Sequence, residues 1–214
     1  MARRKDHTHE EIRTLAVGIV MEHLQIFPPE TLSLRKVAQR VGYSPATLIN
    51  VFGSYDQLLL AANARTLDQL SARLDSAQAQ HPGGLEQLLA FAEAYLEFAR
   101  QHPYQWQLLF QHRMPADETV PQWQQQRIDS LFSAIESALA ELVPTATTEE
   151  LELASRTIWA SVHGICALAL DDKLFAGSHI HGTPMMSSLI RHYVSAWCQQ
   201  HNAPGATNNK GNRS

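Results

Sequence analysis

Residues 33–52 read Ser-Leu-Arg-Lys-Val-Ala-Gln-Arg-Val-Gly-Tyr-Ser-Pro-Ala-Thr-Leu-Ile-Asn-Val-Phe, a pattern typical of two short helices joined by a tight turn. Ser33 and Ser44 each precede an apolar repeat at helical spacing, where a hydroxyl can accept a hydrogen bond from an orphan backbone N–H. Gly42 follows the first repeat. A glycine at this position indicates the end of a helix, because glycine tolerates the left-handed conformation that ends many helices. Pro45 suits the first turn of the second helix. The segment therefore predicts a helix-turn-helix, whose second helix can enter the major groove of DNA.

Apolar periodicity predicts that the rest of the chain is helical as well, with no strand alternation and no internal repeat. We expect an all-α protein of about nine helices, with a three-helix helix-turn-helix domain followed by a helical bundle. Besides the two helices above, the pattern predicts helices over residues 8–27, 56–80, 85–101, 104–112, 121–142, 149–172 and 185–200. Pro28 and Pro29 are expected to end the first of these.

The expected domains are a helix-turn-helix domain over residues 1–56, a ligand-binding and dimerisation domain over 57–202 and a disordered tail over 203–214. Net charge is +1 for residues 1–56 and −5 for the remainder, a mild bias that suits a DNA-facing N-terminal part. The basic cluster Arg3-Arg4-Lys5 is either an arm on DNA phosphates or a solubilising tail.

Composition is that of a soluble globular protein, with 214 residues, 44% hydrophobic and 18% charged. No apolar run approaches the ~20 residues that span a bilayer, and no secretory signal is evident, so we expect a cytoplasmic protein. Cys166 and Cys198 are expected to be buried free thiols, with a disulfide or redox switch as the alternative. No cofactor is expected, and the histidines near residue 180 give only a weak metal signal.

The first turns of the second helix of the motif are expected to supply the contacts to base edges. Asn50 can bond bidentately to adenine, and Thr47 can bond a base or pack its methyl group on thymine. The DNA-binding prediction comprises Ser33, Arg35, Tyr43, Ser44, Pro45, Ala46, Thr47, Asn50 and Tyr55. For Lys36 and Arg40, a solvated face is as plausible as a phosphate contact.

Aromatic residues concentrate in the predicted bundle, where a pocket between helices could bind a small molecule. The pocket prediction comprises Phe91, Tyr95, Phe98, Trp106, Phe110, Trp123, Trp159 and His163. The first three follow core-like helical spacing, so ordinary core packing is an alternative for them. His163 either bonds a neighbour within the core or contacts the ligand. With no basic cluster in the bundle, a largely apolar ligand is expected.

The chain resembles the tetracycline-repressor-like (TetR) family of transcriptional regulators. The resemblance rests on Leu34-Arg35-Lys36-Val37-Ala38, Val41-Gly42-Tyr43-Ser44-Pro45-Ala46-Thr47-Leu48, Phe52-Gly53-Ser54 and Leu58-Leu59. Trp159-Ala160-Ser161-Val162-His163-Gly164 is similar to a Trp-x-x-x-His-Gly signature in one branch of the family. The resemblance implies a homodimer that binds operator DNA and releases it when a small molecule occupies the C-terminal domain.

The chain departs from this family at three positions of the motif. Ile49 stands where members usually carry Tyr, Val51 where they carry His, and Tyr55 where they carry Lys. The family's tyrosine hydroxyl and lysine commonly touch phosphates, so the departures imply weaker or differently anchored DNA binding. The hydroxyls of Tyr43 and Tyr55 could still donate hydrogen bonds.

Three hypotheses follow from the sequence. The first is a ligand-responsive repressor that dimerises through its last two long helices, with Ile190 and Trp197 completing the contact, and binds a palindromic operator. The second is a dimeric binding module of the same fold that has lost operator recognition. The third, an α-helical enzyme, ranks last, because no nucleophile motif, carboxylate pair or phosphate loop is evident.

Overall fold

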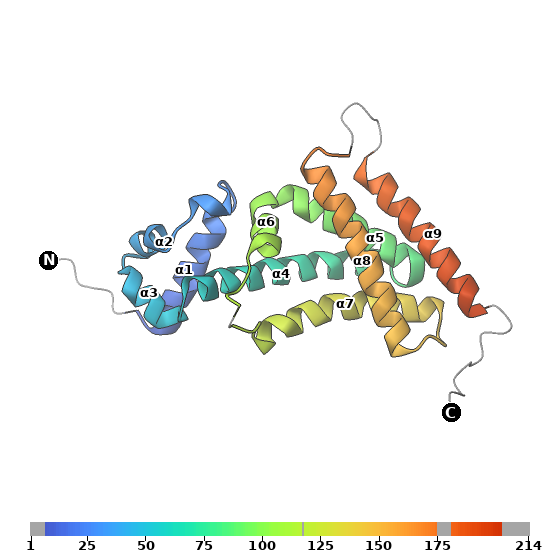
Figure 1. Ribbon diagram of the computed structural model, residues 1–214, viewed down its shortest axis with the longest axis horizontal. Helices are drawn as coiled ribbons and strands as arrows, with labels where there is room; N and C mark the ends of the chain where they lie inside the picture. The colour runs from blue at the N-terminus through green and yellow to red at the C-terminus, as the bar shows by residue number, and fades with distance from the viewer. Residues whose placement is uncertain (1–6, 117, 175–180, 203–214) are drawn as a thin grey trace. The chain divides into compact units, whose positions relative to one another are not determined.

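The computed structural model describes residues 7–116, 118–174 and 181–202, and these residues form helices without strands (Figure 1). The all-α prediction is therefore confirmed. The elements are α1 (His9–His23), the 3-10 helix η1 (Pro29–Thr31), α2 (Leu34–Val41), α3 (Pro45–Phe52), α4 (Tyr55–Gln80), α5 (Gly84–Gln101), α6 (Pro103–Gln111), α7 (Gln122–Leu142), α8 (Thr148–Leu170) and α9 (Gly182–Asn202). The Arg3–Lys5 cluster, His179 and the tail after residue 202 lie outside the described residues.

Most helix boundaries lie within three residues of those predicted, and the exception is the end of α1. The sequence predicts that this helix continues to the prolines at 28 and 29, but it ends at His23. Residues 24–27 turn instead, with the N–H groups of Ile26 and Phe27 both bonding the His23 carbonyl oxygen. A proline disfavours helix in the residue before it, but it does not fix how many residues earlier the helix ends.

Side-chain caps explain several of the other boundaries. Thr8 and Glu11 form a reciprocal capping box at the start of α1, and Thr147 and Glu150 form another at the start of α8. Ser54 caps α4, since its hydroxyl accepts from the Gln57 N–H at 3.0 Å. The sequence pattern predicts that this helix starts at Asp56, but the hydroxyl two residues earlier satisfies the orphan donor.

The chain divides into two compact units by packing. Unit 1 contains residues 7–72 and 98–128, and unit 2 contains 73–97 and 129–202, within the described residues. These units are defined by packing and not by function. The boundary between the DNA-binding and ligand-binding domains at residues 56 and 57 therefore stays a prediction.

The core of the first three helices lies in unit 1. Its fully buried members include Val20, Val37 and Leu48, one from each of α1, α2 and α3. Leu58 of α4 and Leu108 of α6 belong to the same cluster. The amphipathic faces predicted for α2 and α3 are therefore confirmed, and the core fixes which face of α3 remains outside.

In unit 2, α8 and α9 lie side by side (Figure 1). α9 turns Met186, Ile190, Val194 and Trp197 inward, at helical spacing. By length and composition alone, α8 is long and apolar enough to cross a membrane, whereas the sequence analysis expects no such segment. Within its most apolar window, 28% of the residues are buried. A core helix of a soluble protein passes the same test.

Candidate nucleic-acid interface

The N-terminal turn of α3 is organised by Ser44. Its hydroxyl accepts a hydrogen bond from the Thr47 N–H at 3.1 Å and lies 2.9 Å from the Thr47 hydroxyl. Pro45 occupies the first turn, as predicted. The turn before α3 follows the prediction too, because Ser33 caps α2 and Gly42 has a φ of +85°. The local geometry of a helix-turn-helix is therefore present from residue 33 to residue 52.

The outward side of α3 carries the predicted base-contacting residues. Pro45, Ala46 and Asn50 are exposed, and Thr47 is half-buried through its bond to Ser44. The side chain of Asn50 makes no hydrogen bond with another described residue, so both the C=O and the NH₂ of its amide are available to a base edge.

α1 holds α3 through a side chain that the sequence analysis did not single out. The Arg13 guanidinium donates a 2.6 Å hydrogen bond to the Val51 carbonyl oxygen, one of the orphan acceptors at the end of α3. The same guanidinium lies 4.7 Å from the centre of the Phe52 ring. Arg13 thus positions α3 through contacts with Val51 and Phe52. In the sequence, Arg13 lies three residues after Glu10, and this spacing does not indicate a contact with α3.

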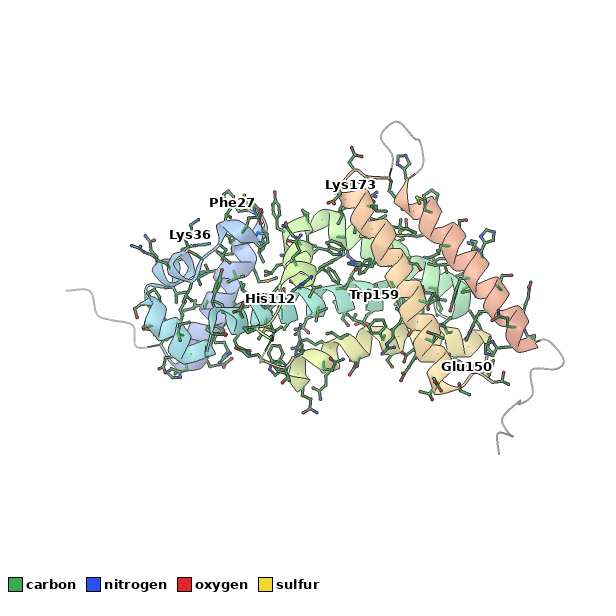
Figure 2. The ribbon with its side chains drawn as sticks, viewed as in Figure 1. Phe27, Lys36, His112, Glu150, Trp159 and Lys173 are labelled. Atoms are coloured by element: carbon green, nitrogen blue, oxygen red, sulfur yellow. The ribbon has the colours of Figure 1, made fainter. Side chains whose placement is uncertain are left out.

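Three basic residues of α2 differ in their intrachain contacts. The Arg40 guanidinium pairs with the Glu22 carboxylate at 2.6 Å, and the Lys36 ammonium donates to the Thr31 carbonyl oxygen. Arg35 is exposed, and its guanidinium makes neither an ion pair nor a hydrogen bond with any described residue. Arg35 is therefore the basic side chain of α2 best placed to reach a phosphate. Figure 2 labels Lys36 on α2.

The two predicted tyrosine donors are partly engaged within unit 1. The Tyr43 hydroxyl lies 3.0 Å from His7 Nδ1 and accepts from the His7 N–H at 3.2 Å. Tyr55 packs against the core cluster, and burial, together with the adjacent Asp56 carboxylate, raises its pKa to about 12. Its phenol therefore stays protonated at neutral pH and keeps a donor hydrogen.

The family departures occupy two different environments. Val51 is buried in the core, with 7% of its surface exposed, whereas Ile49 is exposed at 38% on the side of α3 that also carries Asn50. Ile49 is therefore the departure that changes the surface of this helix. An isoleucine there offers an apolar contact and no hydrogen bond.

The eight predicted pocket residues divide between the two units, and all but Trp123 are buried or half-buried. Phe91, Tyr95, Trp159 and His163 belong to unit 2; Phe98, Trp106, Phe110 and Trp123 belong to unit 1. Trp123 is 38% exposed, with the Arg127 guanidinium over its ring, because it lies in the first turn of α7. None of the eight lines the hollow of about 230 Å³ between α5 and α9.

Unit 2 brings three of these residues together. The Tyr95 hydroxyl lies 2.8 Å from His163 Nδ1, and the Trp159 ring lies 5.3 Å from the imidazole (Figure 2 labels Trp159). Burial lowers the pKa of His163 below its ordinary value of 6.5. A neutral imidazole can accept a hydrogen bond at one nitrogen and donate at the other.

The fold and the capped, outward-facing α3 define the class: a DNA-binding helix-turn-helix regulator followed by an α-helical bundle. A family profile described as "Tetracyclin repressor-like, C-terminal domain" matches residues 88–193. The chain belongs to the TetR family of transcriptional regulators. Members of this family are non-enzymatic DNA-binding proteins, which agrees with the expectation that the chain is not an enzyme.

Solved structures show the same fold at low sequence identity. A Rhodococcus protein of unknown function is 18% identical, with a TM-score of 0.70 over 91% of this chain and 98% of its own. A TetR-family regulator from Streptomyces coelicolor is 22% identical, with a TM-score of 0.62 over 90% and 84%. The TetR-family regulator PfmR from Thermus thermophilus is 18% identical, with a TM-score of 0.54 over 86% of this chain and 97% of its own. No curated protein matches the chain.

Proposed function

We propose that this regulator is a repressor that binds a palindromic operator as a homodimer and is released by a largely apolar small molecule. The observation that carries the proposal is the outer face of α3. There the side chain of Asn50 is exposed and makes no hydrogen bond within the described residues. On α2, the Arg35 guanidinium is likewise exposed and has no ion pair among them. An amide suits adenine, and an arginine suits a phosphate. Val37 and Ala38 of α2, and Leu48, Val51 and Phe52 of α3, are committed to the core.

The proposed dimer surface is the outer face of α8. Leu153 and Leu168 are 68% and 45% exposed, and Thr157, Ala160 and Gly164 lie between them on one helical stripe. A Cβ atom added at Gly164 would meet nothing within 4 Å, so this stripe is open within the chain. An exposed apolar stripe with small central residues suits close packing against a second copy of the same helix.

One part of the expected dimer contact is wrong. Ile190 and Trp197 of α9 are 0% and 7% exposed, because they pack into the chain's own bundle. We therefore propose that α9 contributes its exposed side, which includes Ser188 and Ser195, in place of these two residues.

Release by the effector is proposed to be a population shift. A ligand that binds better to one arrangement of the bundle favours that arrangement, and DNA binding falls if its two recognition helices no longer match the ~34 Å groove repeat. The contact of Tyr95 with His163 gives the apolar interior of unit 2 a polar group that could orient such a ligand.

The test is a fluorescence-anisotropy titration of the full chain with the DNA upstream of its own gene, at two salt concentrations. A repressor binds this DNA at least about 10³-fold more tightly than a scrambled duplex, and both affinities fall as salt rises. Equal affinity for the two duplexes contradicts the proposal. It would favour the second candidate, a binding module without operator recognition, for which exposed Ile49 in place of a phosphate donor is the supporting observation.

A further inference from the structure

A hollow of about 230 Å³ lies between α5 and α9 in unit 2 (Figure 1 labels both helices). Its base is apolar and buried, since Ala92 and Met186 are 6% and 1% exposed. None of the aromatic residues predicted for the effector pocket lines it, so the hollow is a separate place in unit 2 where a small molecule can bind. Its polar lining side chains are His81, Glu86, Glu93, Thr183, Ser187 and Arg191.

Two contacts fix the register of α5 against α9. The Arg191 guanidinium lies 3.6 Å from the Glu86 carboxylate, near the start of α5. Toward the end of α5, a Cβ atom added at Gly182 would lie 3.2 Å from Leu96 Cδ2. The two helices are therefore antiparallel, and Glu93, three residues before Leu96, is level with about residue 185 of α9.

This register brings three oxygen-bearing side chains to one end of the hollow. Thr183 and Ser187 are one helical turn apart on the same face of α9, and the level of Glu93 falls between them. The two hydroxyl residues are half-buried, and none of the three side chains makes a hydrogen bond with another residue that the structure describes. One carboxylate and two hydroxyl oxygens thus line the same space and are free to accept hydrogen bonds from a ligand.

The charges around the hollow do not balance. Glu86 is paired with Arg191, whereas Glu93 has no ion pair within the described part of the chain. With two carboxylates against one guanidinium, the lining has a net charge of −1 when His81 is neutral. A ligand with one positive charge balances this lining, and Glu93 repels an anion.

A primary ammonium group matches this set of groups. It has one positive charge and three N–H donors, one for each of the oxygen-bearing side chains at this end of the hollow. Leu89 and Ala90, which follow Glu86 and precede Glu93 on α5, offer apolar surface for a short aliphatic chain. At about 30 Å³ for each water molecule, the hollow has the volume of about eight waters, which is enough for a small amine.

We propose that Glu93, Thr183 and Ser187 bind the ammonium group of a small primary amine. The aliphatic chain of this amine contacts Ala90 and Met186. The amine is a second ligand, separate from the apolar effector, and its site does not depend on operator binding. Because the site exists only where α5 and α9 are folded together, a bound amine also stabilises the folded chain.

The test uses the methionine methyl signals in ¹H–¹³C correlation spectra of the full chain at pH 7.5, where histidine is mostly neutral. Met186 lines the hollow, and Met186→Leu, a change of similar volume, assigns its signal by disappearance. The probe is pentylammonium, and the matched control probe is 1-pentanol, which has the same chain and no charge. Met21 of α1 belongs to unit 1, and neither probe should shift its signal.

We expect pentylammonium to shift the Met186 signal in a saturable way and 1-pentanol to leave it unchanged. Glu93→Gln keeps the shape of the side chain but removes its charge, so it should weaken pentylammonium binding about threefold, as loss of an exposed ion pair does. Glu152→Gln, the same change at an exposed glutamate of α8, should leave the affinity unchanged. Both glutamates are exposed, so neither change should unfold the chain.

Three results would overturn the inference. They are a Met186 signal that does not respond to pentylammonium, a response to 1-pentanol as large as that to pentylammonium, and equal affinities of Glu93→Gln and wild type. The spectra contain neither DNA nor the apolar effector, so the outcome is separable from that of the proposed function. A protein that fails to select its upstream DNA can still bind the amine, and a repressor that does not bind the amine rejects only this site.

Discussion

Arg13 and Val51 join the first and third helices across a 2.6 Å hydrogen bond from the guanidinium to the backbone carbonyl oxygen. The contact is charge-assisted, and the guanidinium also covers the ring of Phe52. Because Arg13 bonds the backbone at the C-terminal end of α3, we expect it to affect DNA binding by positioning this helix, as well as through its charge.

Replacement of Arg13 by methionine should therefore lower stability and operator affinity together. Loss of a hydrogen bond to a charged group costs about 1.5–3 kcal/mol, and we expect the lower end because the Arg13 side chain is 43% exposed. Urea unfolding measures the first effect and anisotropy the second. Arg13→Lys keeps the positive charge but loses the fork geometry of the guanidinium. Its DNA binding should therefore depend on salt as in wild type, while its free energy of unfolding stays below that of wild type. A variant as stable as wild type contradicts the role.

Gly42 offers a test of the turn itself. Its φ of +85° is left-handed, and a Cβ atom added there would meet nothing within 4 Å. Gly42→Ala should thus destabilise by about 1–2 kcal/mol through backbone strain alone. Gly18, in the middle of α1, also has open space for a Cβ atom, so Gly18→Ala should stabilise by about 0.5–1 kcal/mol. Thermal unfolding of both variants should show shifts of opposite sign; equal signs would contradict the argument.

The sequence predicted what depends on local chemistry. Caps at Ser33 and Ser44, the glycine at 42 and the apolar spacing of α2 and α3 act within a few residues, so their geometry followed from the pattern. Contacts between distant segments could not be predicted this way. Nothing at Arg13 or Glu22 in the sequence indicates that they meet Val51 and Arg40, respectively, because folding selects these partners from many equally suitable groups.

The candidate sites show the same limit. The exposure of Asn50 follows from the phase of the apolar face of α3, and that face could be read from the sequence. The inward position of Ile190 and Trp197 could not, since an apolar stripe predicts burial without distinguishing the chain's own core from a partner. The hollow between α5 and α9 was missed because Glu93 and Ser187 belong to helices that are distant in the sequence, and only packing brings them to one place.

His163 should make stability depend on pH. Burial lowers its folded-state pKa below the ordinary 6.5, so between these two values the unfolded chain binds the proton more readily. Stability is then fully present above pH 6.5 and falls as pH drops toward the folded pKa. Urea unfolding at pH 7.5 and 5.5 should show a smaller loss in His163→Gln than in wild type. Equal losses would contradict this assignment, because the other histidines are common to both proteins.

The proposed dimer surface predicts a change in association state. Leu153→Glu and Leu168→Glu place a carboxylate on the exposed stripe of α8, where a partner helix would desolvate it. Each should raise the dimer dissociation constant by about tenfold or more, since burial of an unpaired charge costs well above 1.4 kcal/mol. Sedimentation equilibrium measures this. Leu15→Glu is the matched control, because Leu15 of α1 is 42% exposed and lies off this surface.

The predicted DNA-contacting residues should separate into two classes by the dependence of their effects on DNA sequence and on salt. Thr47→Ala and Asn50→Ala should each cost about 1–3 kcal/mol of discrimination between operator and scrambled DNA, because we expect their side chains to contact base edges. Arg35→Ala should weaken binding to both duplexes and reduce the salt slope by about one for each protomer's phosphate contact. Gln39→Ala, an exposed change on the same helix as Arg35, is the control for α2. If all three variants bind the operator as wild type does, α3 does not face DNA in the way its exposed side chains indicate.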